Sequence, residues 1–152
     1  MRLPVLLAAR LYAGLMLLIY GIPKLREPAD LLKSVNTYGI LPNDPPLYLN
    51  LAAVGLPWLE VITGAAILTG VLRRGAGFLS AVVLVVFTSA ILMRTFAVMS
   101  ADQIGFSEVA FDCGCGSGVV IIWQKMIFNG SLIVACLLAC MQLRKPIQPL
   151  QS

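Results

Sequence analysis

The sequence predicts an all-α fold, a four-helix transmembrane bundle in a single membrane domain that covers residues 1–152. Hydrophobic residues make up 59% of the chain and charged residues only 12%, whereas a soluble domain has about 25% charged residues. The apolar residues stand in long runs and do not alternate with polar ones, which indicates helices and not a transmembrane barrel. So few polar residues could not cover the surface of a soluble domain of this size.

Four stretches are long enough for a helix to cross a bilayer, which takes about 20 predominantly apolar residues. The first covers about residues 3–22 and is interrupted by Arg10. This interruption, and the lack of a small-x-small cleavage site before Pro23, are unlike a cleaved signal peptide. We therefore expect the first stretch to remain as a membrane helix.

An outer loop follows at residues 23–46 and contains five prolines, so turns break it. Its middle part, residues 28–38, is polar on one side and apolar on the other, which predicts a short helix lying along the membrane surface. The polar side carries Asp30, Lys33 and Asn36, and the apolar side carries Leu31, Leu32 and Val35.

The other three predicted spans cover about residues 47–72, 77–99 and 119–143. Arg73-Arg74-Gly75 predicts a tight turn between the second and third spans. Residues 100–118 form the last loop, and the tail from residue 144 is short and polar.

The distribution of basic residues predicts the orientation, because cytoplasmic loops are enriched in lysine and arginine. One face collects basic residues without any acidic ones, and the other mixes both kinds. Both termini are therefore expected on the cytoplasmic side of a bacterial inner membrane, with Cys113 and Cys115 on the periplasmic side, where disulfides persist. The residues on the purely basic face are Arg2, Arg73, Arg74, Arg144 and Lys145.

Composition also excludes several classes of function. The chain has no histidine, which excludes histidine-ligated haem and zinc sites and leaves proton transfer to carboxylates, tyrosines or thiols. The net charge is +4 without a basic run, so we expect no nucleic-acid partner. We expect no metal site.

Two cysteines stand one glycine apart in the run Phe-Asp-Cys-Gly-Cys-Gly-Ser-Gly at residues 111–118. The Cα atoms of residues i and i+2 lie about 5.5–7 Å apart, which overlaps the usual disulfide range. A bond in so small a ring is strained, and an accessible strained bond is suited to thiol–disulfide exchange. Cys113 and Cys115 are therefore candidate catalytic residues. The alternatives are a structural bond that closes the loop, or a metal held with ligands from another protein.

The remaining cysteines, Cys136 and Cys140, fall one helical turn apart in the fourth span. Some 20 residues separate them from the pair, about 20–30 Å along a helix. We expect them to be small apolar packing residues.

Ionisable residues inside predicted spans are usually paired or functional. We expect Arg10 and Glu60 to form a buried ion pair between the first two spans; the alternative is that Arg10 extends alone toward the cytoplasmic interface. Pro57 lies one turn before Glu60 and predicts a kink that opens a polar pocket near Glu60 and Tyr20. A quinone head group is a candidate ligand for that pocket, and structural packing is the alternative.

Charged residues close to the pair are expected to tune its reactivity. Arg94 and Lys125 would lower a thiol pKa, whereas Asp112 would raise it by charge repulsion. The alternative for both cations is that they only anchor helices at the interface.

The chain resembles the DoxX-like superfamily of membrane proteins, most closely its MauE (methylamine-utilisation) branch, over nearly its whole length. The resemblance implies a four-helix membrane protein tied to extracytoplasmic thiol redox chemistry or quinone electron transfer, and the MauE branch is associated with maturation of the disulfide-rich small subunit of methylamine dehydrogenase. Gly116-Ser117 departs from the aromatic residue usual after the second cysteine. The residues that carry the resemblance are Arg10, Tyr20-Gly21-Ile22-Pro23-Lys24-Leu25, Tyr38-Gly39-Ile40-Leu41-Pro42, Leu56-Pro57-Trp58-Leu59-Glu60, Gly64, Arg94, Cys113-Gly114-Cys115-Gly116 and Asn129.

Three functions follow as hypotheses. The first is a membrane thiol-redox protein whose cysteine pair exchanges disulfides with a periplasmic or membrane protein partner and passes electrons to a quinone. The second is a non-catalytic subunit of a larger membrane electron-transfer complex, packed through small residues such as Gly14, Gly64, Ala65 and Gly130. The third is a transporter, which the lack of a visible inverted repeat disfavours.

Overall fold

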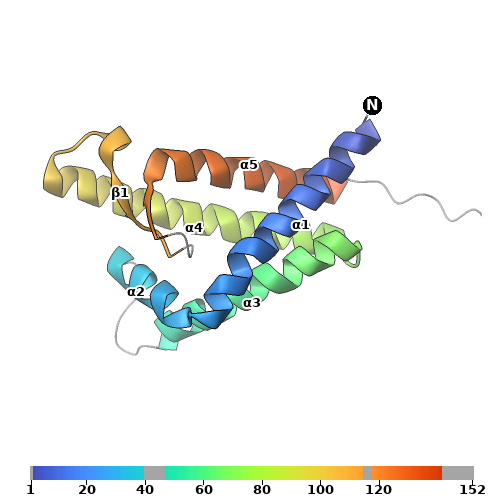
Figure 1. Cartoon of the computed structure of the whole chain (residues 1–152), viewed down its shortest axis with the longest axis horizontal. Helices are drawn as coiled ribbons and strands as arrows, with labels where there is room; N and C mark the ends of the chain where they lie inside the picture. Colours follow the sequence, from blue (N-terminus) through green and yellow to red (C-terminus); the bar gives the residue numbers. More distant parts are fainter. Residues whose placement is uncertain (1, 40–46, 115–117, 142–152) are drawn as a thin grey trace, which may run out of the picture.

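The computed structural model describes residues 2–39, 47–114 and 118–141. Within these residues five α-helices account for most of the chain (Figure 1). They are α1 (Arg2–Arg26), α2 (Pro28–Tyr38), α3 (Leu47–Thr69), α4 (Arg73–Asp102) and α5 (Ile122–Met141). A 3₁₀ turn (Phe106–Glu108) and a hairpin of two short strands, β1 (Ala110–Asp112) and β2 (Val119–Ile121), connect α4 to α5.

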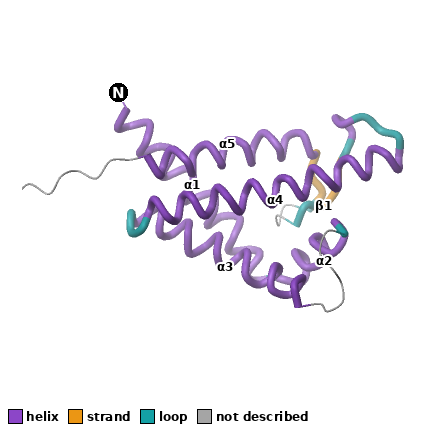
Figure 2. Tube along the Cα trace, turned by 180° about the vertical axis from the view of Figure 1, so that it is seen from behind, coloured by secondary structure: helices purple, strands orange, loops and turns teal. Residues whose placement is uncertain are grey.

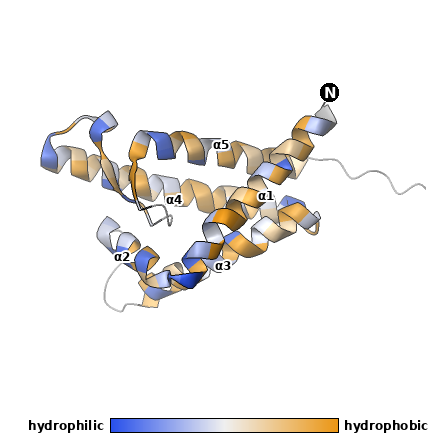
Figure 3. Ribbon diagram, viewed as in Figure 1, coloured by the Kyte–Doolittle hydropathy of each residue, from blue (hydrophilic) through white to orange (hydrophobic). Residues whose placement is uncertain are grey.

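Four of the helices, α1, α3, α4 and α5, are long and apolar enough to cross a membrane, which confirms the predicted four-helix fold. Their outer faces carry large apolar side chains, including Ile62, Val86 and Ile127, each more than 60% exposed. Figure 3 shows this apolar colouring along the long helices, with hydrophilic residues gathered on α2 and near the connection from α4 to α5. So extensive an exposed apolar surface is suited to contact with lipid.

The helix α2 confirms the predicted short amphipathic helix. Pro28 occupies its first turn, where a missing N–H costs nothing. Leu31 and Val35 are buried on one face, and Lys33 and Asn36 are exposed on the other. The helix ends at Gly39, which takes the left-handed conformation (φ 67°) and donates its N–H to the carbonyl of Asn36.

The helices α1 and α3 pack closely against each other because two glycines meet at their crossing. A Cβ atom on Gly64 would lie 3.0 Å from Leu17 Cβ and 3.1 Å from the carbonyl oxygen of Gly14. Gly14 and Gly64 therefore serve a contact inside this chain. Gly130 has open space around it.

The start of α1, the turn between α3 and α4 and the end of α5 lie at one end of the bundle, and α2 and the hairpin lie at the other (Figures 1 and 2). The helices α4 and α5 run side by side, and α1 packs on both α3 and α5. The core between them is built of small and medium-sized apolar residues such as Ala13, Leu17, Ile67, Leu84 and Cys136.

The connections on both sides of α4 differ from the prediction. The predicted tight turn at Arg73-Arg74-Gly75 is wrong, because the turn lies at Val71 and Leu72 and helix α4 already starts at Arg73, before the predicted start at residue 77. The helix continues to Asp102, so its 30 residues span about 45 Å and exceed a hydrocarbon core of about 30 Å. Residues 119–121, predicted to begin the fourth helix, form β2 and pair with β1, with Phe111 opposite Val120. The run Val-Val-Ile-Ile is β-branched throughout, which favours a strand, and helix α5 begins only where Ile122 donates its N–H to the carbonyl of Val109.

Candidate functional site

The tip of the β1–β2 hairpin carries the first cysteine of the pair. Cys113 follows β1 directly and is fully buried, packed with Ile91 of α4, Val109 and Ile122. The sequence predicted an accessible pair, and for Cys113 this is wrong because the hairpin folds its side chain against α4 and the start of α5. Cys115 lies outside the described residues, so the pairing of the two cysteines stays a prediction.

Tyr38 fixes the backbone at Cys113. At the end of α2, its hydroxyl donates a 2.8 Å hydrogen bond to the carbonyl of Cys113, and its ring makes edge contacts with Phe87 and Phe111. Burial, and after it the negative charge of Asp112, raise the pKa of Tyr38 well above its ordinary value of 10.0. The hydroxyl therefore remains a proton donor at physiological pH. Tyr38 was not predicted as a site residue, and the signal for it was its place in the Tyr-Gly-Ile-Leu-Pro segment.

Gly114 brings the turn into direct contact with α2. Its φ is +69°, and a Cβ atom there would lie 2.8 Å from Ser34 Cβ and 3.0 Å from Leu31 Cδ1. Its N–H donates to Oδ1 of Asp112 at 2.9 Å. Asp112 therefore orders the turn as a hydrogen-bond acceptor, a role that the sequence did not suggest. Its predicted effect on a thiol pKa stays a prediction.

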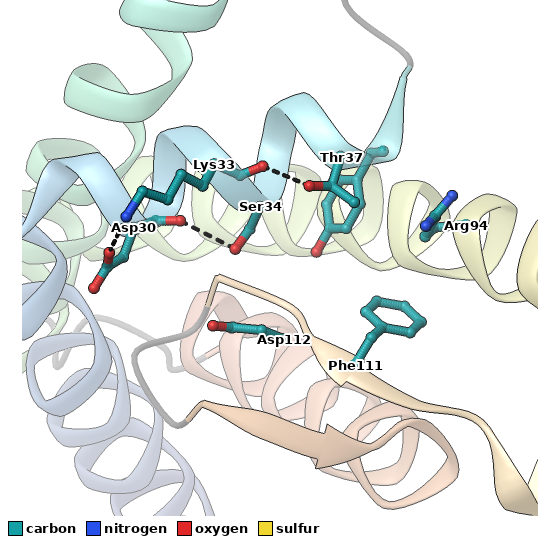
Figure 4. A pocket seen from close by; sticks show the side chains of 8 residues that line it. Asp30, Lys33, Ser34, Thr37, Arg94, Phe111 and Asp112 are labelled. Atoms are coloured by element: carbon teal, nitrogen blue, oxygen red, sulfur yellow. Dashed lines mark hydrogen bonds and ion pairs between the residues drawn. The ribbon is translucent and has the colours of Figure 1, made fainter.

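Two polar pockets flank this turn, and Asp30 and Asp112 line both of them. The first has a volume of about 240 Å³ and lies between α2, α4 and β1. Figure 4 shows Phe111 and Asp112 extending from β1 toward α2, with Arg94 on α4 nearby. Arg94 thus lies on the side of the bundle where the sequence placed it. The residues lining this pocket are Asp30, Lys33, Ser34, Thr37, Tyr38, Arg94, Phe111 and Asp112.

The second pocket, of about 350 Å³, opens on the other side of the turn. Gly114 and Gly118 line it from the hairpin, Lys24 and Arg26 line it from the end of α1, and Glu27 lines it from the junction between α1 and α2. Cys113 and Gly114, which we call the cysteine turn, therefore stand between two pockets large enough to admit side chains of another molecule.

The predicted Arg10–Glu60 ion pair is wrong. Glu60 instead pairs with Lys24, whose Nζ lies 2.7 and 2.8 Å from the two carboxylate oxygens. The sequence placed Lys24 in the outer loop, but its side chain is 93% buried inside the bundle. As an isolated buried charge would be very costly in this setting, each residue supplies the counter-charge that the other needs.

Arg10 has a different role, at the far end of the α1–α3 contact. Its guanidinium donates to the carbonyls of Ile67 and Leu68, which belong to the last turn of α3 and lack partners within that helix. The antiparallel register explains the correction. It sets Arg10 beside Gly70 and Gly21 beside Glu60, so about ten residues of α3, or about 15 Å, separate the two predicted partners.

Lys125 faces the bundle interior. Its Nζ lies 4.9 Å from the ring centroid of Tyr20 and 5.1 Å from that of Phe128. Among the described residues, neither pocket at the turn includes Lys125 in its lining. It lines a small cavity of about 30 Å³ together with Tyr20 and Glu60, which is where the sequence predicted a polar pocket.

A larger apolar groove of about 530 Å³ lies between α2, α3 and α4. Tyr38 lines this groove and also the first polar pocket. The groove therefore runs from the apolar helix faces up to the residue that holds Cys113. Its lining residues are Val35, Tyr38, Tyr48, Leu51, Ala52, Gly55, Leu56, Leu59, Val82, Val83, Val86, Phe87 and Ala90.

The other two cysteines lie far from the hairpin on α5. Cys136 is fully buried in the core, and both it and Cys140 are free thiols. A Cβ atom on Gly77 would lie 2.8 Å from the carbonyl oxygen of Cys136 and 2.8 Å from Sγ of Cys140. This close contact between α4 and α5 agrees with the predicted packing role.

Comparison with known proteins identifies one family. The chain matches the family described as methylamine utilisation protein MauE over residues 2–142. The methylamine utilization protein MauE of Methylophilus methylotrophus is 33% identical over 107 residues, which are 70% of this chain and 50% of that protein. The match thus spans about half the length of that relative. No solved structure matches the chain.

Proposed function

The chain belongs to the MauE family of methylamine utilisation proteins, and from this we propose that it is a membrane thiol–disulfide oxidoreductase that forms disulfides in a periplasmic partner. The observation that carries the proposal is the anchored cysteine turn. Cys113 is fixed through Tyr38, Gly114 is in contact with α2, and a pocket opens on each side.

The partner that we propose is the disulfide-rich small subunit of methylamine dehydrogenase, in keeping with the family's link to methylamine utilisation. The turn would act in the periplasm, where such a subunit acquires its disulfides. The two pockets offer Lys33, Arg94, Asp30 and Asp112 for polar contacts with a polypeptide bound at the turn.

The buried position of Cys113 suggests separate roles for the two cysteines. A partner thiolate attacks the sulfur of Cys115, the Cys113–Cys115 bond breaks, and Cys113 leaves as a thiolate. A second partner thiolate then attacks the mixed disulfide and releases Cys115. The partner gains one disulfide, and this chain is left with two reduced cysteines. Arg94, in the adjoining pocket, favours the thiolate form.

Reoxidation of the two cysteines requires an acceptor, and we propose a quinone in the apolar groove. The groove suits an isoprenoid tail because its lining is almost wholly aliphatic and aromatic, and it ends at Tyr38, whose hydroxyl meets Cys113. A bound quinone supplies an acceptor for two electrons and two protons. Tyr38 would orient the ring, and Phe87 and Leu59 would exclude water from it.

Trapping experiments test the assignment of the two cysteines. The Cys113→Ser variant should accumulate a mixed disulfide with the partner through Cys115, because the cysteine that would reverse the attack is missing. The Cys115→Ser variant should accumulate little, because the remaining sulfur is buried. Non-reducing gel electrophoresis with mass spectrometry measures both adducts, and Cys136→Ser serves as the control. Equal trapping by both variants would contradict the assignment, and trapping by neither would contradict the function.

Filling the groove tests the quinone site. Gly55 lines the groove, and a side chain there meets nothing within 4 Å, so Gly55→Leu should narrow the groove without disturbing the backbone. We expect it to reduce both the binding of a short-tailed ubiquinone analogue and the reoxidation of the cysteines by at least about tenfold, which corresponds to 1.4 kcal/mol. Gly130→Leu, on the open face of α5, is the matched control. Unchanged binding in Gly55→Leu would show that the groove holds only a lipid chain.

The burial of Cys113 also favours a second function, in which the cysteines form a permanent clip and the protein is a non-catalytic subunit of a membrane complex. A bond enclosed by Ile91, Val109 and Ile122 would resist exchange. In that case the double variant Cys113→Ser/Cys115→Ser would still support disulfide formation in the partner but would assemble poorly. Loss of partner disulfides with normal assembly would exclude the clip.

A further inference from the structure

Three charged side chains meet inside the bundle, within helices that can cross a membrane. Lys24 of α1 donates to both carboxylate oxygens of Glu60 on α3, and the two side chains are 7% and 13% exposed. Lys125 of α5 is close enough to interact electrostatically with both of them. All three line the same cavity.

The charges in this cluster do not balance. Two ammonium groups face one carboxylate, and Lys24 already engages both oxygens of that carboxylate. Among the described residues no carboxylate lies within ion-pair distance of Lys125 Nζ. Its contacts with Tyr20 and Phe128 are cation–π contacts, which attract a cation without neutralising it. One positive charge is therefore left over in a region of low dielectric constant.

The cavity between these groups has the size and lining of a small polar ligand site. Its volume is about 30 Å³, enough for a particle the size of one water molecule. Besides the charged groups it is lined by Asn129, which is 3% exposed and donates its amide to Thr88 at 3.0 Å. Tyr20 and apolar side chains complete the lining.

We infer that this cavity binds one small monovalent anion the size of chloride, held by Lys125, whose charge the neutral Lys24–Glu60 pair leaves unbalanced. The anion completes a cluster of two positive and two negative charges and joins α5 to the α1–α3 contact. Its role is independent of the cysteines, because it neutralises a charge that the fold encloses whatever their redox state.

Thermal unfolding of the purified full chain in detergent tests the inference, with chloride replacing gluconate at constant ionic strength. A ligand that binds only the folded state raises the unfolding temperature in a saturable way. For the unmodified chain we expect a rise of about 3–10 °C at a ten- to hundredfold excess over Kd. Bromide should act like chloride, and sulfate, which is larger and divalent, should not.

The Lys125→Met variant should fold and lose the chloride-dependent rise, because it removes the unpaired charge and leaves a cluster that is already neutral. Lys33→Met removes an exposed lysine of α2 and should keep the full rise. A chloride titration of bromide-loaded protein, followed by bromine X-ray absorption, measures occupancy directly. The inference is overturned if the unmodified chain shows no saturable response, or if Lys125→Met responds as strongly as Lys33→Met.

Discussion

Gly114 joins the cysteine turn to α2 because its position has no room for a side chain. The left-handed φ of +69° already disfavours other residues, and the side chains of Ser34 and Leu31 occupy the space where a Cβ atom would lie. The neighbouring hydrogen bond from Tyr38 to the Cys113 carbonyl depends on the same close approach. The two contacts together fix the cysteine turn.

Gly114→Ala should therefore destabilise the protein more than Gly118→Ala does. Both glycines have positive φ, but Gly118 has nothing within 4 Å of its Cβ position. Strain alone costs about 1–2 kcal/mol at either site, and the overlap with Ser34 adds about 1–3 kcal/mol at Gly114. Denaturant unfolding in mixed micelles measures the difference. Equal losses in the two variants would show that the turn does not rest on α2.

The packing of α1 against α3 determines which charged side chains come into contact. Close packing at Gly14 and Gly64 holds the two helices in an antiparallel register. That register brings Lys24 to Glu60 and Arg10 to the last carbonyls of α3. An ion pair near one end and a capped helix terminus at the other thus oppose any sliding of the two helices.

Removing one partner of the buried pair should be costly. Glu60→Gln leaves Lys24 buried without a carboxylate, which costs about 3–5 kcal/mol. Lys24→Met should cost less, because Lys125 still interacts with Glu60. The double variant should lose less than the sum of the two, with a coupling of about 1–3 kcal/mol. Asp30→Asn/Lys33→Met, at the exposed pair on α2, is the control and should change stability by less than about 0.5 kcal/mol. Additive losses at Lys24 and Glu60 would contradict the pair.

Hydropathy was sufficient to predict the four long helices, because the thickness of the bilayer sets the length of each apolar run independently of the neighbouring helices. The partner of Glu60 could not be predicted in the same way. It depends on the register of two helices, and that register is set by the close contact at Gly14 and Gly64. Lys24 stood in an apparently polar loop, and only the continuation of α1 to Arg26 carries it into the bundle.

At the level of the whole molecule, the two ends of the bundle differ. One end holds the start of α1 and the α3–α4 turn, and the other holds α2 and the hairpin (Figures 1 and 3). Arg73 and Arg74 begin α4 directly after that turn, and both polar pockets are lined by α2 and the hairpin. The distribution of basic residues predicts that the first end is cytoplasmic. The orientation decides whether the cysteine turn meets an oxidising compartment.

Single cysteines in a cysteine-free background test this orientation. Ser107→Cys lies in the exposed 3₁₀ turn near the hairpin, and Gly75→Cys lies at the opposite end with open space around it. An impermeant maleimide should label Ser107→Cys in intact cells and Gly75→Cys only after the membrane is opened. The reverse pattern would place the turn in the cytoplasm.

Part of the candidate site could also be predicted from the sequence. The cysteine pair and Arg94 were identified from residue type and position, and Arg94 lines a pocket beside the turn. The hairpin was not foreseen, because a strand of three residues gives little periodicity and Val119–Ile121 also suits a membrane helix. The buried state of Cys113 follows from that hairpin and so could not be foreseen either.

The long separation between Tyr38 and Cys113, 75 residues, sets an order of events during synthesis. At about 5–20 residues per second, a ribosome produces α2 about 4–15 s before Cys113, the first cysteine of the chain. The α2 part of the surface that contacts the turn can thus form before Cys113 is made, whereas Ile122, which also packs on Cys113, follows it. Cys136 and Cys140 are made later still and lie near the far end of α5. Both the order of synthesis and the distance therefore disfavour a disulfide between either of them and Cys113.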